Sequence, residues 1–333
     1  MPEIEIMRAL LLDTYDSGTF VERELPKPVA QRGELLIRIA ASGLNPIDTK
    51  IKAGAAPYAM PELPAVLGTD MAGTVEAVGE GVSGFAVGDE VYGLTGGVRG
   101  LQGSLAQFVA VDAALVALKP SNLSLVEAAT LPLVALTAWE GLVDRAKVQP
   151  GQTVLVQGGA GGVGHIVIQL ARALGANVFA TASSAKQDIL RELGATPIDY
   201  NATTVDEYVA LHTGGEGFDV VYDTVGGTAL DASLIATKHY GHVASCAAFG
   251  DHNFAGAALR CVTLSGVFVL LPMLSGRGRA HHGEVLKQIA ELVETGKVHP
   301  LLDGQVFEFA EAERAYEAQA SGSVTGKTMI KIA

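Results

Sequence analysis

One stretch, residues 154–174, constrains the fold more than any other part of the chain. It reads VLVQGGAGGVGHIVIQLARAL, a pattern typical of a buried strand, a glycine turn and a helix in immediate succession. Gly159, Gly161 and Gly164 satisfy the motif G-x-G-x-x-G. The first glycine permits a tight turn, the second lets the backbone approach a pyrophosphate, and the third lets the helix pack on the strand. The stretch therefore predicts a dinucleotide-binding unit.

The motif alone is weak support, because the chain holds 40 glycines and an ordinary glycine-rich loop can match it. Its context makes the prediction strong. The turn follows a predicted strand and opens a predicted helix, whose unpaired N–H groups and dipole favour a phosphate. The predicted cofactor-binding turn consists of Gly159, Ala160, Gly161, Gly162, Val163 and Gly164.

Length and charge narrow the class of protein. A chain of 333 residues with 49% apolar and 18% charged residues suggests a globular protein of about two domains. The net charge of -13 argues against a nucleic-acid partner held by electrostatics. The chain starts with acidic residues and has no apolar run of transmembrane length. We therefore expect a cytoplasmic protein without a signal peptide or membrane segment.

Residues 1–125 alternate short β-rich runs with glycine and proline turns, which predicts a compact, irregular β domain. Helical spacing follows over Ser124–Leu142, where Ser124 and Glu127 form a candidate capping box. The expected strands are Met7–Leu12, Glu34–Ala41, Val66–Val78, Asp89–Gly93 and Ser104–Val111.

From Thr153 onward strands and helices alternate, which is the pattern of a doubly wound α/β domain with a parallel sheet. The expected strands are Val154–Gln157, Asn177–Ala182, Pro197–Asp199, Phe218–Tyr222, Gly241–Ser245 and Val262–Leu270. The expected helices are Gly162–Leu174, Ala185–Leu193, Thr204–His212 and Gly227–Thr237. A helix, a strand, a helix and a strand then close the chain, over Gly283–Thr295, Gln305–Phe309, Glu311–Ala320 and Lys327–Ile332.

This order of β domain, glycine turn and closing segment resembles the medium-chain dehydrogenase/reductase superfamily, specifically its zinc-free quinone oxidoreductases of the zeta-crystallin type. The matching stretches cover essentially the whole chain and are residues 41–48 (ASGLNPID), 67–73 (LGTDMAG), 87–91 (VGDEV), 158–164, 182–186 (ASSAK) and 322–327 (GSVTGK). The resemblance implies a GroES-like catalytic domain over residues 1–125, a Rossmann NADPH-binding domain over 126–270 and a return segment over 271–333 that completes the catalytic domain. It also implies a homodimer, with Val262–Leu270 as a candidate edge strand.

Zinc is the first chemical question that the resemblance raises. Alcohol dehydrogenases of this superfamily hold a catalytic zinc with an early Cys, a Gly-His-Glu stretch and a later Cys. In this chain Leu44 and Asn45 lie in the neighbourhood of the first ligand, and residues 68–70 read Gly-Thr-Asp. Residues 93–108 contain no Cys for a structural zinc, and the two cysteines of the chain form no C-x-x-C pair. We predict that the protein binds no metal.

The choice of cofactor depends on the residues after the second strand of the nucleotide domain. NAD-binding domains place an acid there, about 20 residues beyond the glycines, to hold the ribose hydroxyls. Here Ser183, Ser184 and Lys186 follow the strand, without an acid. A lysine and hydroxyls suit a 2'-phosphate, and Tyr200 matches the family position that packs over the same region. These residues predict NADPH, the alternative being a surface lysine and an ordinary N-cap serine.

Without a metal to polarise an isolated carbonyl, hydride transfer is easiest to an acceptor that spreads charge itself, such as a quinone, enone or enal. By resemblance, Asn45 is the catalytic residue that faces the nicotinamide and the substrate. Thr137 then lies along the nicotinamide, Phe249 and Gly250 follow its supporting strand, and Lys327 lies near the cofactor. Each has an alternative without function, such as a turn at Asn45, a helix-surface hydroxyl at Thr137 and core packing for Phe249.

The substrate pocket is less well defined by the sequence. Candidate wall residues are Lys50, which replaces an aromatic residue of several relatives, and Tyr58, Met60, Leu94 and Met273, for which core packing is the alternative. Asp48 is either a proton relay or a residue hydrogen-bonded locally at a turn or helix start. Its spacing from Asn45 suits local bonding, which we expect.

Three functions follow from these residues. The leading hypothesis is an NADPH-dependent, zinc-free oxidoreductase that reduces quinones or related conjugated carbonyls. The alternative within enzymes is an enoyl or 2-alkenal reductase, which needs a proton donor that the sequence does not identify. A carrier-linked enoyl substrate would also need a basic entrance, for which Arg277 and Arg279 are the candidates. The third hypothesis is an NADPH-binding protein with a structural or regulatory role and little turnover.

Overall fold

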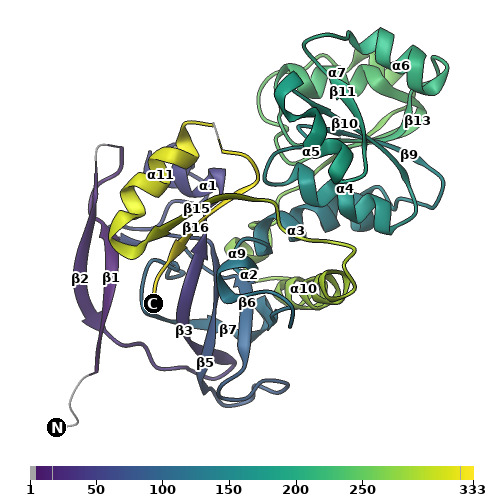
Figure 1. The fold of residues 1–333 in the computed structure, drawn as a ribbon. Helices are drawn as coiled ribbons and strands as arrows, with labels where there is room; N and C mark the ends of the chain where they lie inside the picture. Colours follow the sequence, from purple (N-terminus) through teal and green to yellow (C-terminus); the bar gives the residue numbers. More distant parts are fainter. Residues whose placement is uncertain (1–4, 17, 323) are drawn as a thin grey trace. The chain divides into compact units, whose positions relative to one another are not determined.

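The computed structural model describes residues 5–16, 18–322 and 324–333, so the acidic start of the chain and Ser323 of the matched stretch 322–327 lie outside the described residues. The chain divides into two units, whose elements are labelled in Figure 1. Unit 1 holds the described residues of Met1–Leu133, Leu270–Thr295 and Leu302–Ala333, and unit 2 holds Val134–Val269 and Gly296–Leu301. Within the described ranges, every helix is too short or too polar to cross a lipid bilayer.

Unit 1 is built mainly from β-strands. Its larger sheet has the order β15-β16-β3-β5-β6-β8, with β7 paired to β3, and its smaller sheet has the order β2-β1-β4. In β3, Ile37 and Ile39 are buried and Arg38 between them is exposed, which is the alternation of a half-buried strand. The strands are β1 Ile6–Leu12, β2 Phe20–Pro26, β3 Glu34–Gly43, β4 Ala65–Val66, β5 Asp70–Val78, β6 Glu90–Leu94, β7 Phe108–Asp112, β8 Val116–Leu118, β15 Leu302–Glu308 and β16 Lys327–Lys331.

The C-terminal strand β16 completes the larger sheet by pairing antiparallel with β3. Gly43, at the end of β3, has no room for a side chain, because an added Cβ would lie 2.1 Å from the carbonyl oxygen of Ala129. The N–H group of Leu44 donates to the carbonyl oxygen of Thr328 over 2.9 Å. The pairing therefore places Lys327, the first residue of β16, at the end of β3.

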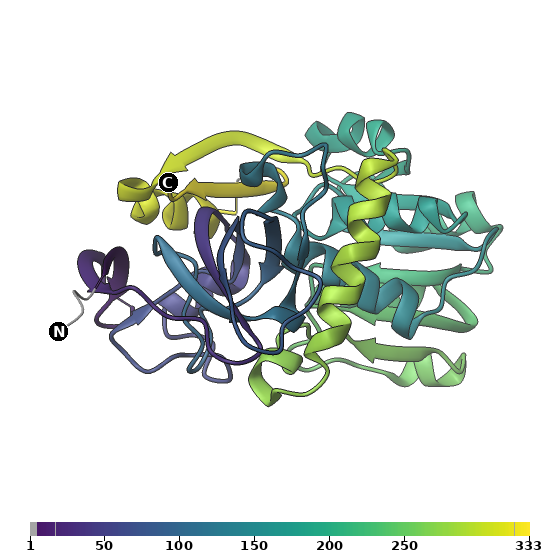
Figure 2. The same ribbon diagram turned by 90° about the horizontal axis from the view of Figure 1, so that it is seen from below.

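Short helices surround the sheets of unit 1, and the long helix α10 packs on β8 and on the 3-10 helix η1 (Figure 2). Close packing at this contact explains Gly283, since an added Cβ would lie 2.8 Å from the carbonyl oxygen of Ala114. The helices are α1 Pro46–Lys52, α2 Leu125–Ala128, α9 Leu271–Ser275, α10 Arg279–Glu294 and α11 Ala312–Ala320, with the 3-10 helices η1 Ala113–Leu115 and η4 Phe309–Glu311.

Unit 2 contains a parallel sheet in the order β11-β10-β9-β12-β13-β14. Its strand order reverses between β9 and β12, as in a doubly wound nucleotide-binding fold. The strands are β9 Thr153–Gln157, β10 Asn177–Ala182, β11 Thr196–Asp199, β12 Phe218–Asp223, β13 Thr237–Ser245 and β14 Thr263–Gly266. The helices are α3 Pro132–Trp139, the π-helix η2 Glu140–Arg145, α4 Gly164–Ala173, the 3-10 helix η3 Ser184–Lys186, α5 Gln187–Glu192, α6 Val205–Thr213, α7 Thr228–Ala236 and α8 Ala255–Leu259.

The predicted fold class, a GroES-like β domain with a doubly wound Rossmann domain, is confirmed, but two predicted elements are divided and a third is shortened. The strand expected over Val66–Val78 is interrupted at Gly68, whose backbone is left-handed (φ +99°). The helix expected over Ser124–Leu142 is interrupted before Pro132, which begins α3, because a proline disfavours helical backbone in the preceding residue. The strand expected over Val262–Leu270 ends at Gly266, and Pro272 opens α9 soon after it.

Candidate active site

The glycine turn predicted from the sequence lies between β9 and α4 in unit 2. Gly158 begins it with a left-handed backbone (φ +74°). Gly164, the first residue of α4, has no space for a side chain, because an added Cβ would lie 2.2 Å from the carbonyl oxygen of Gly158. An added Cβ on Gly159 would lie 2.8 Å from the Cβ of Ala180. These glycines let α4 begin close against the sheet.

The turn leaves backbone donors available for an anionic ligand. Within the described residues, the N–H groups of Ala160 and Gly162 have no backbone acceptor. Both lie just before the N-terminus of α4, where the helix dipole favours negative charge. An added Cβ on Gly161 would approach only the carbonyl oxygen of Gly158, at 3.2 Å, so this side of the turn is open. The turn therefore fits the pyrophosphate of a nicotinamide dinucleotide.

The residues predicted to select the cofactor follow β10. Ser183 is the N-cap of η3, which contains Ser184 and Lys186. Among the described residues, no carboxylate forms an ion pair with Lys186. The side chain of Tyr200 is 56% exposed. These four residues lie at the C-terminal ends of β10 and β11, where a doubly wound sheet binds its ligand.

An acid that the sequence analysis missed lies among them. Asp199 ends β11, which pairs in parallel with β10 so that Asp199 lies opposite Ala182. Its carboxylate accepts hydrogen bonds from the Ser184 hydroxyl and from the N–H group of Asn201, the latter over 2.9 Å. These two bonds hold the pKa of Asp199 below its usual range. A search confined to the end of β10 could not find this acid, but the predicted parallel pairing of the two strands pointed to its position.

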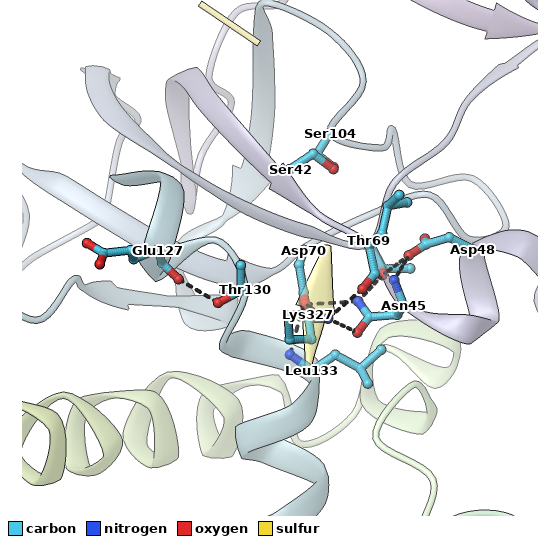
Figure 3. A network of polar contacts seen from close by, with 11 residues as sticks. Ser42, Asn45, Asp48, Thr69, Asp70, Ser104, Glu127, Thr130, Leu133 and Lys327 are labelled. Carbon is cyan, nitrogen blue, oxygen red and sulfur yellow. Dashed lines mark hydrogen bonds and ion pairs between the residues drawn. The ribbon is translucent and has the colours of Figure 1, made fainter. Parts of the chain in front are cut away.

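In unit 1 the predicted catalytic residue lies in a buried polar cluster (Figure 3). The cluster, which we call the Asn45 cluster, consists of Asn45, Asp48, Thr69, Asp70 and Lys327, and no member is more than 2% exposed. Nδ2 of Asn45 donates to Asp70 Oδ2 over 2.9 Å and to Thr69 Oγ1 over 3.1 Å. Oδ1 of Asn45 accepts a hydrogen bond from Lys327 Nζ. The amide is therefore fixed between a carboxylate and an ammonium group.

The start of α1 and the start of β5 hold the acidic side of the cluster. Asn45 is the N-cap of α1, and its N–H group donates to Asp48 Oδ2 over 2.8 Å. The Thr69 hydroxyl donates to the same oxygen over 3.2 Å. Asp70 Oδ1 accepts from the N–H group of Leu133 over 2.9 Å. The local hydrogen bonding expected for Asp48 is confirmed, and Thr69 and Asp70 are site residues that the sequence analysis considered only as replacements for zinc ligands.

Lys327 brings a buried positive charge to the cluster. Its Nζ donates to the carbonyl oxygen of Leu44 over 2.6 Å and lies 3.8 Å from Asp70 Oδ2. Burial lowers the pKa of Lys327, while the carboxylates of Asp70 and Asp48 raise it. The resemblance assigned this lysine to the neighbourhood of the cofactor, whereas the structure shows its bond to Asn45.

The Asn45 cluster contains two carboxyl groups, of Asp48 and Asp70, but only one ammonium group, of Lys327. Ionisation of both carboxyl groups is therefore unfavourable in the interior. Burial raises the pKa of Asp48 to about 7 and that of Asp70 to about 6, and Lys327 opposes both shifts. Asp70 is the acid that forms an ion pair with the ammonium, and burial gives Asp48 a strongly raised pKa. Within the described residues, the buried atom Asp48 Oδ1 has no hydrogen-bond partner. The cluster therefore holds a buried carboxyl group with a raised pKa, one oxygen of which has no partner among the described residues.

The donors of the cluster do not fit a zinc ion. Asn45, Thr69 and Asp70 lie at the positions where the resemblance places zinc ligands, but zinc in proteins prefers thiolate, imidazole and carboxylate. The ammonium of Lys327 already supplies the positive charge there. In the part of the chain that the structure describes, no group of three or more His, Cys, Asp or Glu side chains could hold a metal ion.

The predicted pocket residues of unit 1 have different environments. Lys50 is exposed on α1, whereas Leu94 and Met273 are buried at 0% and 3% exposure, as core packing would require. Met60 lines an open cavity of about 690 Å³ beside Arg99, and the Asn45 cluster does not contribute to its lining. The remaining lining residues are Leu11, Leu25, Pro61, Glu62, Pro64, Ala65, Val66, Gly100, Leu101 and Gln102.

Tyr58 is two residues before Met60, which lines the cavity. Its carbonyl oxygen accepts a hydrogen bond from Arg99 Nε over 3.0 Å. A substrate role for these residues stays a prediction. Arg279, a candidate for a basic entrance, donates to Asp112 Oδ2 over 3.1 Å and to the carbonyl oxygen of Met273 over 3.0 Å. Its guanidinium is therefore engaged within unit 1, while Arg277 is exposed.

The other predicted cofactor contacts belong to unit 2. Thr137 is 4% exposed in α3, and its carbonyl oxygen accepts a hydrogen bond from the Tyr222 hydroxyl over 2.5 Å. Phe249 is 58% exposed after β13, so the alternative of core packing is wrong for it. Gly250 beside it has a left-handed backbone (φ +100°). A role of these three residues beside the nicotinamide stays a prediction.

Two family models match the chain. The alcohol dehydrogenase GroES-like domain matches residues 31–121 in unit 1, and the zinc-binding dehydrogenase model matches residues 193–330. The fold and the nucleotide cradle thus define an oxidoreductase that uses a nicotinamide cofactor. The relatives described next identify its family.

The chain is 38% identical over 320 residues to the 2-methylene-furan-3-one reductase of Solanum lycopersicum, covering 93% of this chain and 74% of that protein. It is 34% identical over 319 residues to the NADPH-dependent alkenal/one oxidoreductase, chloroplastic, of Arabidopsis thaliana, covering 93% and 75%. A crystal structure of an alcohol dehydrogenase superfamily protein from Novosphingobium aromaticivorans has a TM-score of 0.96 and 52% identity, covering 98% of this chain and 100% of that one. The chain belongs to the medium-chain dehydrogenase/reductase family, as the sequence analysis predicted.

Proposed function

We propose that this protein is an NADPH-dependent reductase of conjugated carbonyl compounds, acting on enones, enals or quinones. The observation that carries the proposal is the Asn45 cluster, which combines a fixed amide, a buried ammonium and a buried carboxyl group with a raised pKa. Two relatives of the chain are named for reducing a methylene-furanone and for acting on alkenals and alkenones. Among these acceptors, we propose enones and enals as the preferred substrates.

Unit 2 would hold the cofactor through its own main chain and side chains. The free N–H groups of Ala160 and Gly162 would bind the pyrophosphate at the start of α4. Lys186, unpaired among the described residues, would bind the 2'-phosphate with Ser183, and Tyr200 would pack over the same group. The bound cofactor supplies a hydride.

Unit 1 would supply what an acceptor needs besides a hydride. Reduction of a conjugated C=C bond also consumes one proton, and Asp48, whose buried carboxyl group has a raised pKa and an Oδ1 without a partner in the described chain, would donate it. Asn45 would hold both acids in place, since its N–H group donates to Asp48 and its Nδ2 donates to Asp70. In this proposal Asp48 is the proton donor, a role for which the sequence alone identifies no residue.

The test is NADPH oxidation in chelator-containing, metal-free buffer against a 2-alkenal, an enone, a benzoquinone and an enoyl thioester, with NADH in parallel. We expect the highest kcat/KM with the enone or the 2-alkenal. Asp48→Asn should lower that kcat/KM by about tenfold to a hundredfold, in the range of general acid catalysis. Glu80→Gln, a change at an exposed ion pair with Arg32 in the same unit, is the matched control.

Three outcomes contradict the proposal in different ways. Preference for the quinone with full activity of Asp48→Asn would show that protonation by the cluster is unnecessary. Preference for the enoyl thioester would assign a carrier-linked substrate. NADPH binding without turnover of any acceptor would favour the structural or regulatory role.

A further inference from the structure

Four residues, Ser183, Ser184, Lys186 and Tyr200, are predicted to bind the 2'-phosphate of the cofactor. The carboxylate of Asp199 lies among them, although its negative charge repels a phosphate. Asp199 accepts the hydrogen bond of the Ser184 hydroxyl, so this hydroxyl is not directed at a ligand. Asn201 N–H holds the other carboxylate oxygen over 2.9 Å. Both carboxylate oxygens are thus fixed, and Asp199 stays ionised at the ligand-binding edge of the sheet.

The frame around Asp199 is also held in place. Nε2 of Gln187 donates to the carbonyl oxygen of Ala182 over 2.8 Å and to that of Ile198 over 3.3 Å, which ties the ends of β10 and β11 together. The hydrogen bond from Ser184, which follows β10, to Asp199, which ends β11, also links these two strands. The carboxylate is therefore a built part of this edge.

We infer that Asp199 is a specificity-determining residue of the cofactor site, which opposes the 2'-phosphate of NADPH and allows the site to bind NADH as well. A carboxylate repels a phosphate group, whereas it accepts hydrogen bonds from the free ribose hydroxyls of NADH. Lys186 acts in the opposite sense, since its ammonium attracts the phosphate. The inference rests on the proposed function only in that the protein binds a nicotinamide dinucleotide.

The test compares the dissociation constants of NADPH and NADH for the full chain and for Asp199→Asn, by isothermal titration calorimetry at low salt. The amide keeps an oxygen for the Ser184 hydroxyl but removes the charge. We expect NADPH to bind about fivefold to tenfold more tightly to Asp199→Asn, as for one like-charge contact near the surface. NADH binding should be unchanged or weaker, and the NADPH gain should shrink in high salt.

Asp188→Asn is the matched control, because it removes the same charge from a side chain that is 90% exposed on the neighbouring helix α5 and pairs with Arg191. It should leave the ratio of the two constants unchanged. A second pair of ligands, 2',5'-ADP and 5'-AMP, isolates the adenosine end, and the Asp199→Asn gain should appear with 2',5'-ADP alone.

An unchanged NADPH to NADH ratio in folded Asp199→Asn would overturn the inference, and so would weaker NADPH binding. Either result would assign Asp199 to the shape of the turn. An equal gain in Asp188→Asn would also overturn it, by showing an effect of net charge. Failure of the unsubstituted chain to bind either dinucleotide would instead refute the proposed function.

Discussion

Replacement of Lys327 by methionine tests the charge balance of the Asn45 cluster. Methionine fills much of the volume of the lysine stem but cannot donate to the carbonyl oxygen of Leu44 or to Asn45 Oδ1. It also leaves Asp48 and Asp70 without a cation in the interior. Loss of one partner from a buried ion pair costs about 3–5 kcal/mol. We therefore expect Lys327→Met to be strongly destabilised at pH 8.

The cost should depend on pH, because the remaining acids can take up protons. Burial raises the pKa of Asp70 to about 6 while the ammonium is present, and removal of the ammonium raises it further. A group with a raised pKa contributes stability that is complete at low pH and is lost as the pH rises through its folded pKa. Above pH 6 the penalty of Lys327→Met should thus grow by up to about 1.4 kcal/mol per unit, until the pH reaches the raised pKa of Asp70 in the variant.

The assay is urea unfolding followed by far-UV circular dichroism at pH 5, 6, 7 and 8. The single tryptophan, Trp139, lies in unit 2, so its fluorescence reports that unit separately. Asp70→Asn/Lys327→Met removes the carboxylate together with its cation and should recover the pH-dependent part of the loss. A loss that does not change with pH, or a double variant no more stable than Lys327→Met at pH 8, would refute this account of the cluster.

Three further predictions concern other parts of the chain. Gly164→Ala should weaken NADPH binding at least tenfold in a calorimetric titration, because the added Cβ would lie 2.2 Å from Gly158 O and would displace the turn. Unchanged affinity would contradict the binding of the cofactor at the glycine turn. Stability of the unsubstituted chain should fall between about pH 5 and pH 7 as Asp48 loses its proton, and Asp48→Asn should flatten that dependence in urea titrations. We also propose a homodimer through the edge strand β14, so light scattering should give twice 34.4 kDa, and a monomeric mass would exclude it.

The sequence predicted the fold class well because periodicity and glycine turns are local signals. The parallel strands of unit 2 alternate with helices along the chain, so all of them were expected. Strand β2 was missed because most of its residues are exposed and it shows no alternation. Helix α1 was missed because it is only 7 residues long and its Asn45-Pro46 start equally indicates a turn.

The site was harder to predict because its contacts join distant segments. Asn45 and Lys327 are hydrogen-bonded although 282 positions separate them. The resemblance placed both near the cofactor, but only the pairing of β16 with β3 shows that they touch. Asp199 was missed for a similar reason, since it reaches Ser184 from the next strand. Individual polar residues could be nominated from the sequence, whereas their partners depend on strand register.

The charges of the Asn45 cluster differ from those of a metal site. In a metal site, anionic or neutral ligands surround a metal cation. Here the cation is the Lys327 ammonium, bonded to Asn45, and its buried acids outnumber it by one. Burial raises the pKa of both acids, and of the two only Asp70 forms an ion pair with the ammonium among the described residues. Under the proposed function, this buried acid with a raised pKa beside the amide, Asp48, would serve the reduction of conjugated carbonyls, in which an acceptor takes up a hydride and a proton.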